Sequence, residues 1–69
     1  MQDEEFLKII GGNISRLRKE KGFSQTDLGL IIDMEKTYLS SIENGHQNPT
    51  TLTLKKIADA IGCEVVDFF

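Results

Sequence analysis

Apolar side chains recur along the first part of this chain at spacings of three and four residues, the period of one helix face. The series consists of Phe6, Ile10, Ile14 and Leu17. Gly22 follows it, as is typical just beyond a helix C-terminus, so we expect the first helix to end near Lys21. Gly11 and Gly12 interrupt the series and weaken a helix by about 2 kcal/mol relative to two alanines. The first helix is therefore predicted to start only near Asn13.

Local start and stop signals mark two further helices in the middle of the chain. Ser24 is followed three residues later by Asp27. This pair resembles a capping box, which predicts a second helix that runs from there to about Ile32. A third helix is expected over about residues 35–44, with its apolar positions turned inward, and Gly45 ends it.

The last third of the chain shows the same helical pattern. Residues 48–50 indicate a turn and an N-cap, and a fourth helix follows them up to Gly62. Residues 64–69 can add one short helical turn. No segment alternates apolar and polar positions as a strand does. The sequence therefore predicts an all-α fold, a compact bundle of five helices with short connections.

Size and composition limit what such a bundle can contain. The chain has 69 residues, of which 39% are hydrophobic and 28% charged, so we expect one domain over residues 1–69. Cys63 is the only cysteine and His46 the only histidine, so neither an internal disulfide nor a four-ligand metal site is expected, and no cofactor. An acidic start and the lack of a long apolar stretch predict a cytoplasmic chain without a membrane segment.

The charges of the chain provide arguments both for and against a nucleic-acid partner. The net charge of −3 argues against nucleic acid, because phosphate binding depends on clustered lysine and arginine. The acidic side chains gather at both ends, however, and residues 15–56 hold seven basic against five acidic side chains. This asymmetry favours a nucleic-acid partner only weakly, and an ordinary mixed surface would show the same pattern.

The second and third helices, with a short turn between them, match the length of a helix-turn-helix unit. A more specific pattern is carried by Ser24-Gln25, Leu28, Tyr38-Leu39-Ser40, Ile42-Glu43-Asn44-Gly45, Asn48-Pro49-Thr50 and Leu54. With these residues, the chain from about Asn13 to Phe69 resembles the Cro and lambda-repressor-like (XRE-type) helix-turn-helix transcriptional regulators. The resemblance implies sequence-specific binding of double-stranded DNA, with the third helix in the major groove.

The resemblance also implies roles for individual residues. It places Lys36, Thr37 and Ser41 at base edges, where lysine can donate to guanine and a hydroxyl can meet either kind of base. The implied phosphate contacts are Gln25, Tyr38, Asn44 and His46. Behind the DNA surface it implies an ion pair between Arg18 and Glu43, which would join the first helix to the end of the third. Each of these residues also has an ordinary alternative as a solvated or helix-terminal side chain.

The chain departs from the family pattern at several positions. Asp33 stands for the usual glycine of the turn, and aspartate adopts the left-handed conformation more easily than most residues. Glu35 stands where a serine or threonine usually caps the third helix, and its negative charge would point toward the phosphates. Leu30, Ile31 and Leu52 occupy positions that are generally polar. Such a surplus of apolar surface often marks an association site.

These observations predict a transcriptional regulator that acts as a homodimer on a palindromic operator, without a small-molecule effector domain. The hypothetical dimer surface consists of Val65, Val66, Phe68 and Phe69, with Leu30 and Ile31. The alternative for Val66 or Phe68 is a place in the core. Enzymatic activity is not expected, because no nucleophile with a neighbouring base and no carboxylate pair can be assembled. The alternative is a protein-interaction module such as an antitoxin or adaptor, which the acidic total favours. A phage repressor, a restriction-modification controller and a housekeeping regulator fit equally well.

Overall fold

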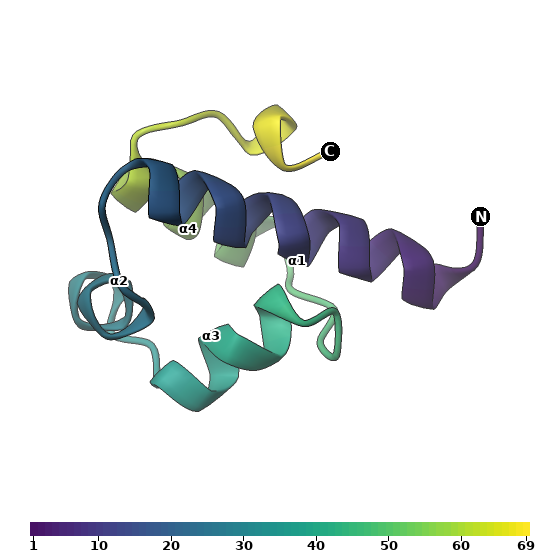
Figure 1. The fold of residues 1–69 in the computed structure, drawn as a ribbon, viewed down its shortest axis with the longest axis horizontal. Coiled ribbons are helices and arrows are strands. Elements are labelled where there is room, and N and C mark those ends of the chain that lie inside the picture. Colours follow the sequence, from purple (N-terminus) through teal and green to yellow (C-terminus); the bar gives the residue numbers. More distant parts are fainter.

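The structure, a computed structural model, describes all 69 residues and contains helices but no strand (Figure 1). In chain order the elements are α1 (Asp3–Glu20), α2 (Gln25–Ile32), α3 (Lys36–Glu43), α4 (Thr51–Ile61) and the 3-10 helix η1 (Val65–Phe68). The predicted all-α fold is confirmed. The fifth helix is a single 3-10 turn rather than an α-helix.

Helices α2 and α4 begin, and α2 also ends, where the local sequence signals predicted. Before α2, the Ser24 hydroxyl accepts a hydrogen bond from the Asp27 amide at 2.9 Å, and the Asp27 carboxylate accepts one from the Ser24 amide at 3.2 Å. The capping box is therefore confirmed. Thr50 caps α4 with its hydroxyl, which accepts a hydrogen bond from the Thr53 amide at 3.1 Å. Asp33 ends α2 in the left-handed conformation with φ 55°, so aspartate takes the place of the usual turn glycine as expected.

The predicted start of the first helix near Asn13 is wrong, because α1 begins at Asp3. Three acidic side chains occupy its first turn, where the positive end of the helix dipole stabilises negative charge. The helix then continues without a break through Gly11 and Gly12. Compared with the predicted start near Asn13, the observed start adds about three turns to the helix.

Gly11 allows α1 to lie directly on the end of α3. A Cβ atom at Gly11 would clash with the carbonyl oxygen of Ile42 and lie 2.6 Å from that of Glu43. A Cβ atom at Gly12 would meet nothing within 4 Å. The close backbone contact at Gly11 therefore accounts for a helix that intrinsic propensity alone disfavours.

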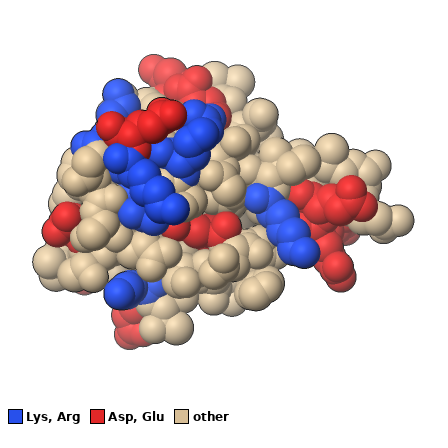
Figure 2. Space-filling model, in the orientation of Figure 1, with Lys and Arg blue, Asp and Glu red and all other residues tan.

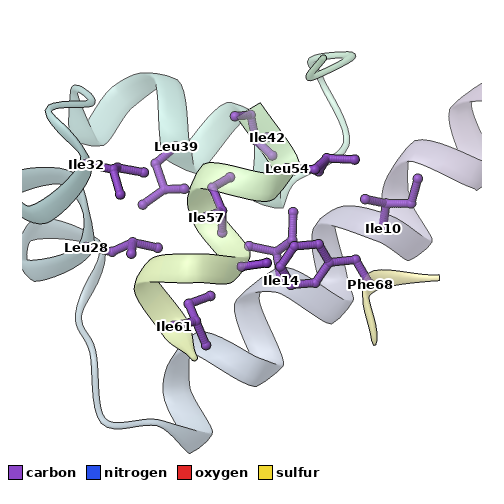
Figure 3. Close-up of a cluster of buried hydrophobic side chains, with 11 residues drawn as sticks. Ile10, Ile14, Leu28, Ile32, Leu39, Ile42, Leu54, Ile57, Ile61 and Phe68 are labelled. Carbon is purple, nitrogen blue, oxygen red and sulfur yellow. The ribbon is translucent and has the colours of Figure 1, made fainter. Parts of the chain in front are cut away.

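Eleven buried apolar side chains form one core, to which all four α-helices and η1 contribute (Figure 3). The buried members are Ile10, Ile14, Leu28, Ile32, Leu39, Ile42, Leu54, Ile57, Ala58, Ile61 and Phe68. The largest of them, Phe68, is completely buried. The sequence left Phe68 open between the dimer surface and the core, and the core position is the one observed, because η1 folds back over α1, where Asn13 donates a hydrogen bond to the Phe68 carbonyl at 2.9 Å.

Phe6 behaves in the opposite way. The helical spacing placed it on the inward stripe, but it is 44% exposed. Its ring instead contacts that of Phe69, with the ring centroids 6.0 Å apart. The first turns of α1 extend past the buried part of the bundle (Figure 1), so a side chain on the inward stripe there finds no core to enter.

In the bundle, α3 and η1 lie on opposite sides of α1 (Figure 1). The side of α3 that faces away from the other helices is uncovered. Every helix in the structure is too short or too polar to cross a membrane.

Candidate nucleic-acid interface

The outer side of α3 carries the polar residues that the sequence pattern singled out. Leu39 and Ile42 hold the helix to the core, and this orientation turns the first residues of α3 toward solvent. Lys36 and Thr37 are exposed, and Ser41, one turn further along, is half-buried. Lys36 has no carboxylate within ion-pair distance. Its ammonium group is therefore available to an external ligand.

An open hollow on this face is lined only by polar side chains. The residues around it are Gln25, Lys36, Thr37, Ser40, Ser41, Asn44 and His46. The structure thus brings together all three residues expected at base edges and three of the four expected at phosphates. Tyr38 lies outside the hollow and is 40% exposed. Ser40, to which the sequence analysis assigned no contact, is also part of the lining.

Behind the hollow, Arg18 and Glu43 form a buried, two-point ion pair. The Arg18 Nε donates to Oε2 of Glu43 at 2.7 Å and Nη2 donates to Oε1 at 2.9 Å. The two side chains are only 7% and 4% exposed. The remaining guanidinium nitrogen donates to the Phe23 carbonyl at 2.8 Å. The pair therefore fixes α1, the α1–α2 connection and the end of α3 to one another.

Gln25 connects this buried pair to the hollow. It is the first residue of α2, and its amide Nε2 donates to Oε1 of Glu43 at 3.0 Å. A carboxylate only accepts hydrogen bonds, so it selects the amide group of Gln25 rather than its carbonyl. The second amide N–H and the carbonyl oxygen are left for a ligand. The sequence analysis missed this contact, since no short-range pattern links residues 25 and 43.

The Glu43 carboxylate is held in its charged form. Burial raises the pKa of this carboxyl, but the hydrogen bonds from Arg18 and Gln25 together with the Arg18 charge outweigh burial and leave the pKa below the usual value of 4.5. A group with a lowered pKa stabilises the fold above its unfolded-state value and loses that contribution as the pH falls through the folded-state value.

We therefore expect the free energy of unfolding to decrease once the pH falls below about 4.5. Urea unfolding at a series of pH values, followed by circular dichroism, measures this decrease. Glu43→Gln should remove that part of the pH dependence, whereas Glu20→Gln, which alters an exposed carboxylate, should leave it in place. Identical profiles for Glu43→Gln and the unmodified protein would contradict the assignment.

The charge around the hollow is sparse. Lys36 is the only lysine or arginine in its lining, and the exposed Glu35 precedes it as the N-cap of α3, without a side-chain capping bond. On the face shown in Figure 2, basic and acidic side chains are mixed and no broad basic field forms. Attraction of an anionic partner to this surface therefore depends on a few individual residues and on helix ends.

Known proteins resemble this chain over most of its length. The uncharacterized HTH-type transcriptional regulator y4dJ of Sinorhizobium fredii is 42% identical over 63 residues, which cover 91% of this chain and 82% of that protein. The control protein C.MunI of Mycoplasma is 42% identical over 65 residues, covering 91% and 88% of the two chains.

A solved structure shows the same arrangement of helices. The restriction-modification controller C.Esp1396I, solved as a tetramer in complex with its natural 35-base-pair operator, matches with a TM-score of 0.80 and 33% identity, covering 91% of this chain and 83% of that one. The pattern of the HTH_3 (Helix-turn-helix) family matches residues 14–68. This match, together with the α2–turn–α3 unit, shows that the chain belongs to the HTH_3 helix-turn-helix family.

Proposed function

We propose that this protein is a sequence-specific DNA-binding transcriptional regulator that places the outer side of α3 in the major groove. The observation that carries the proposal is the polar hollow, in which base-reading and phosphate-binding candidates share one exposed surface. The major groove admits an α-helix and displays a distinct set of donors and acceptors for each base pair. The descriptions of y4dJ as a transcriptional regulator and of C.Esp1396I with its operator support the same function.

Three side chains of α3 are the proposed base readers. Lys36 and Thr37 lie in its first turn, the part of a recognition helix that contacts base edges. Lys36 would donate to O6 and N7 of a guanine, and Thr37 would contact a thymine methyl or donate its hydroxyl. Ser41 follows one turn later and can donate to or accept from either kind of base.

Phosphate contacts are proposed at both ends of the hollow. Gln25 offers its free amide N–H beside the N-terminus of α2, where unpaired backbone N–H groups also favour an anion. Asn44 and His46 lie at the opposite end, beyond the last turn of α3. Tyr38 would add its phenolic hydroxyl from outside the hollow. Contacts on both sides of α3 would fix its register in the groove.

We further propose that two copies act as a homodimer. Leu52 of α4, Val66 of η1 and Phe69 are 77%, 72% and 57% exposed, so apolar surface remains uncovered near the C-terminal side of the bundle. Burying it between two copies would form a dimer, and a two-fold dimer with its α3 helices one helical turn apart could contact two half-sites of one duplex. The alternative, a module that binds only other proteins, is not favoured, since the relatives described above are named as regulators and control proteins.

Selection of bound sites from a random DNA pool tests the function and the dimer together. We expect a palindrome whose half-sites are centred about 34 Å apart. Lys36→Ala should relax the preference at one position of each half-site, with a loss of about 1–3 kcal/mol against the best site. Lys55→Ala, which removes an exposed α4 lysine outside the hollow, serves as the control.

Failure of the pool to yield any enriched sequence would refute the proposed function. Enrichment of a single half-site without a palindrome would refute the homodimer but not DNA binding. An unchanged base preference for Lys36→Ala would remove Lys36 from the base readers.

A further inference from the structure

A second hollow adjoins the first at the loop that follows α3. It is lined by Glu4, Leu7 and Lys8 of α1 and by residues 45–48 of the loop. His46 lines both hollows, so the two are neighbours. The N-terminal half of α1 passes over this loop (Figure 1). The early start of α1 thus places a helical side-chain surface at the edge of the proposed DNA interface.

Lys8 is held against the loop by the absence of a side chain at Gly45. Gly45 has φ +77°, and a Cβ atom there would lie 2.6 Å from Cγ and 2.9 Å from Cα of Lys8. The aliphatic part of Lys8 therefore packs on the bare backbone of the turn. This contact fixes Lys8 at the end of α3, although 37 positions separate it from Gly45 in the sequence.

The charge of Lys8 has no partner within the protein. The residue is exposed, and it takes part in none of the three ion pairs of the structure. Glu4 lies one turn earlier in the same hollow but is not within ion-pair distance. Lys8 is the only lysine or arginine in this lining, and an unpaired ammonium group beside a polar loop is suited to bind a phosphate.

We propose that Lys8 binds a DNA phosphate and extends the DNA interface onto the part of α1 that precedes the family match at residue 14. The inference rests on the proposed function. At this end of α3 the first hollow offers Asn44 and His46 but no lysine or arginine. A sugar–phosphate backbone that contacts them and continues along the surface reaches the second hollow, where Lys8 supplies the positive charge.

The salt dependence of DNA affinity tests this proposal. Each phosphate neutralised by a lysine contributes about 0.9 to the slope of log affinity against log salt. We expect Lys8→Gln to lower the slope by about 0.9 per bound subunit and to weaken binding about eightfold per subunit at 0.1 M salt. Lys8→Arg should keep the original slope. The duplex is the best site from the pool selection, and binding is measured by fluorescence anisotropy.

Lys19→Gln is the matched control, because it also removes one exposed, unpaired positive charge from α1 but lies outside both hollows. Its slope should stay close to that of the unmodified protein. Equal slopes for Lys8→Gln and Lys19→Gln would overturn the role of Lys8 and leave the proposed function intact. An unmodified protein that retains no duplex even at low salt would refute the proposed function, and the inference with it.

Discussion

Replacing Glu43 with alanine is expected to lower the free energy of unfolding by about 3–5 kcal/mol. The substitution leaves the guanidinium of Arg18, with a side chain only 7% exposed, without its carboxylate. Gln25 loses its acceptor at the same time. A domain of this size has a total stability of roughly 3–10 kcal/mol, so the expected loss is a large part of the whole. Urea unfolding followed by circular dichroism measures the change.

Glu20→Ala provides the comparison for this prediction. Glu20 pairs with Arg16 at 3.3 Å on the exposed side of α1, and an exposed pair of this kind contributes only about 0.3–0.5 kcal/mol. A loss below about 1 kcal/mol for Glu43→Ala would resemble that of an exposed pair and would contradict a structural role for the buried one. The difference between the two variants isolates the effect of burial.

The two neighbouring glycines of α1 should respond in opposite directions to alanine. Gly11→Ala is expected to destabilise the protein by about 1–3 kcal/mol or more, because the new methyl group would meet the backbone carbonyls of Ile42 and Glu43, which cannot turn aside as a side chain can. Gly12→Ala is expected to stabilise it by about 1 kcal/mol, since its methyl group meets nothing within 4 Å. Both values come from urea unfolding of the single variants.

The decisive result is whether the two substitutions change the free energy of unfolding in opposite directions. If both alanines stabilise the protein, α1 does not pack on the end of α3 as closely as the structure shows. If both destabilise it, the helix does not continue through residues 11 and 12 in solution. Only opposite signs agree with an unbroken α1 that contacts α3 through Gly11.

The parts of the fold that the sequence predicted correctly depend on neighbours in the chain. Ser24 and Asp27 satisfy each other's backbone groups within one turn, and Thr50 caps a helix that begins at the next residue. Asp33 takes up its left-handed conformation at the end of its own helix. Signals of this range are visible in the sequence without any knowledge of tertiary structure.

The errors arose where distant segments meet. The start of α1 depends on a contact between Gly11 and the end of α3, about thirty residues away, and local helix propensity carries no information on it. For a similar reason the sequence placed Phe6 on the inward stripe, although it is exposed, and left Phe68 open between surface and core, although it is completely buried. Apolar spacing indicates which side of a helix faces inward, but the burial of that side depends on where η1 folds back.

The candidate site likewise contains features that the sequence indicated and features that depend on contacts between elements. The family resemblance implied that Lys36, Thr37 and Ser41 share one side of the third helix, and the structure places all three in one hollow. The hydrogen bond from Gln25 to Glu43 and the position of Lys8 beside Gly45 depend on contacts between elements. Neither was visible before the helices were placed relative to one another.

The lining of the α3 hollow has a consequence for how this protein could diverge. Thr37, Ser40 and Ser41 are short side chains, and a bridging water can carry a contact from such a hydroxyl to base atoms beyond its direct reach. Longer amide or guanidinium side chains at these sites would span the gap directly. Since Leu39 and Ile42 anchor the helix from its other side, such an exchange at the exposed Thr37 leaves the interior untouched. New operator preferences are thus accessible in single mutational steps without loss of the fold.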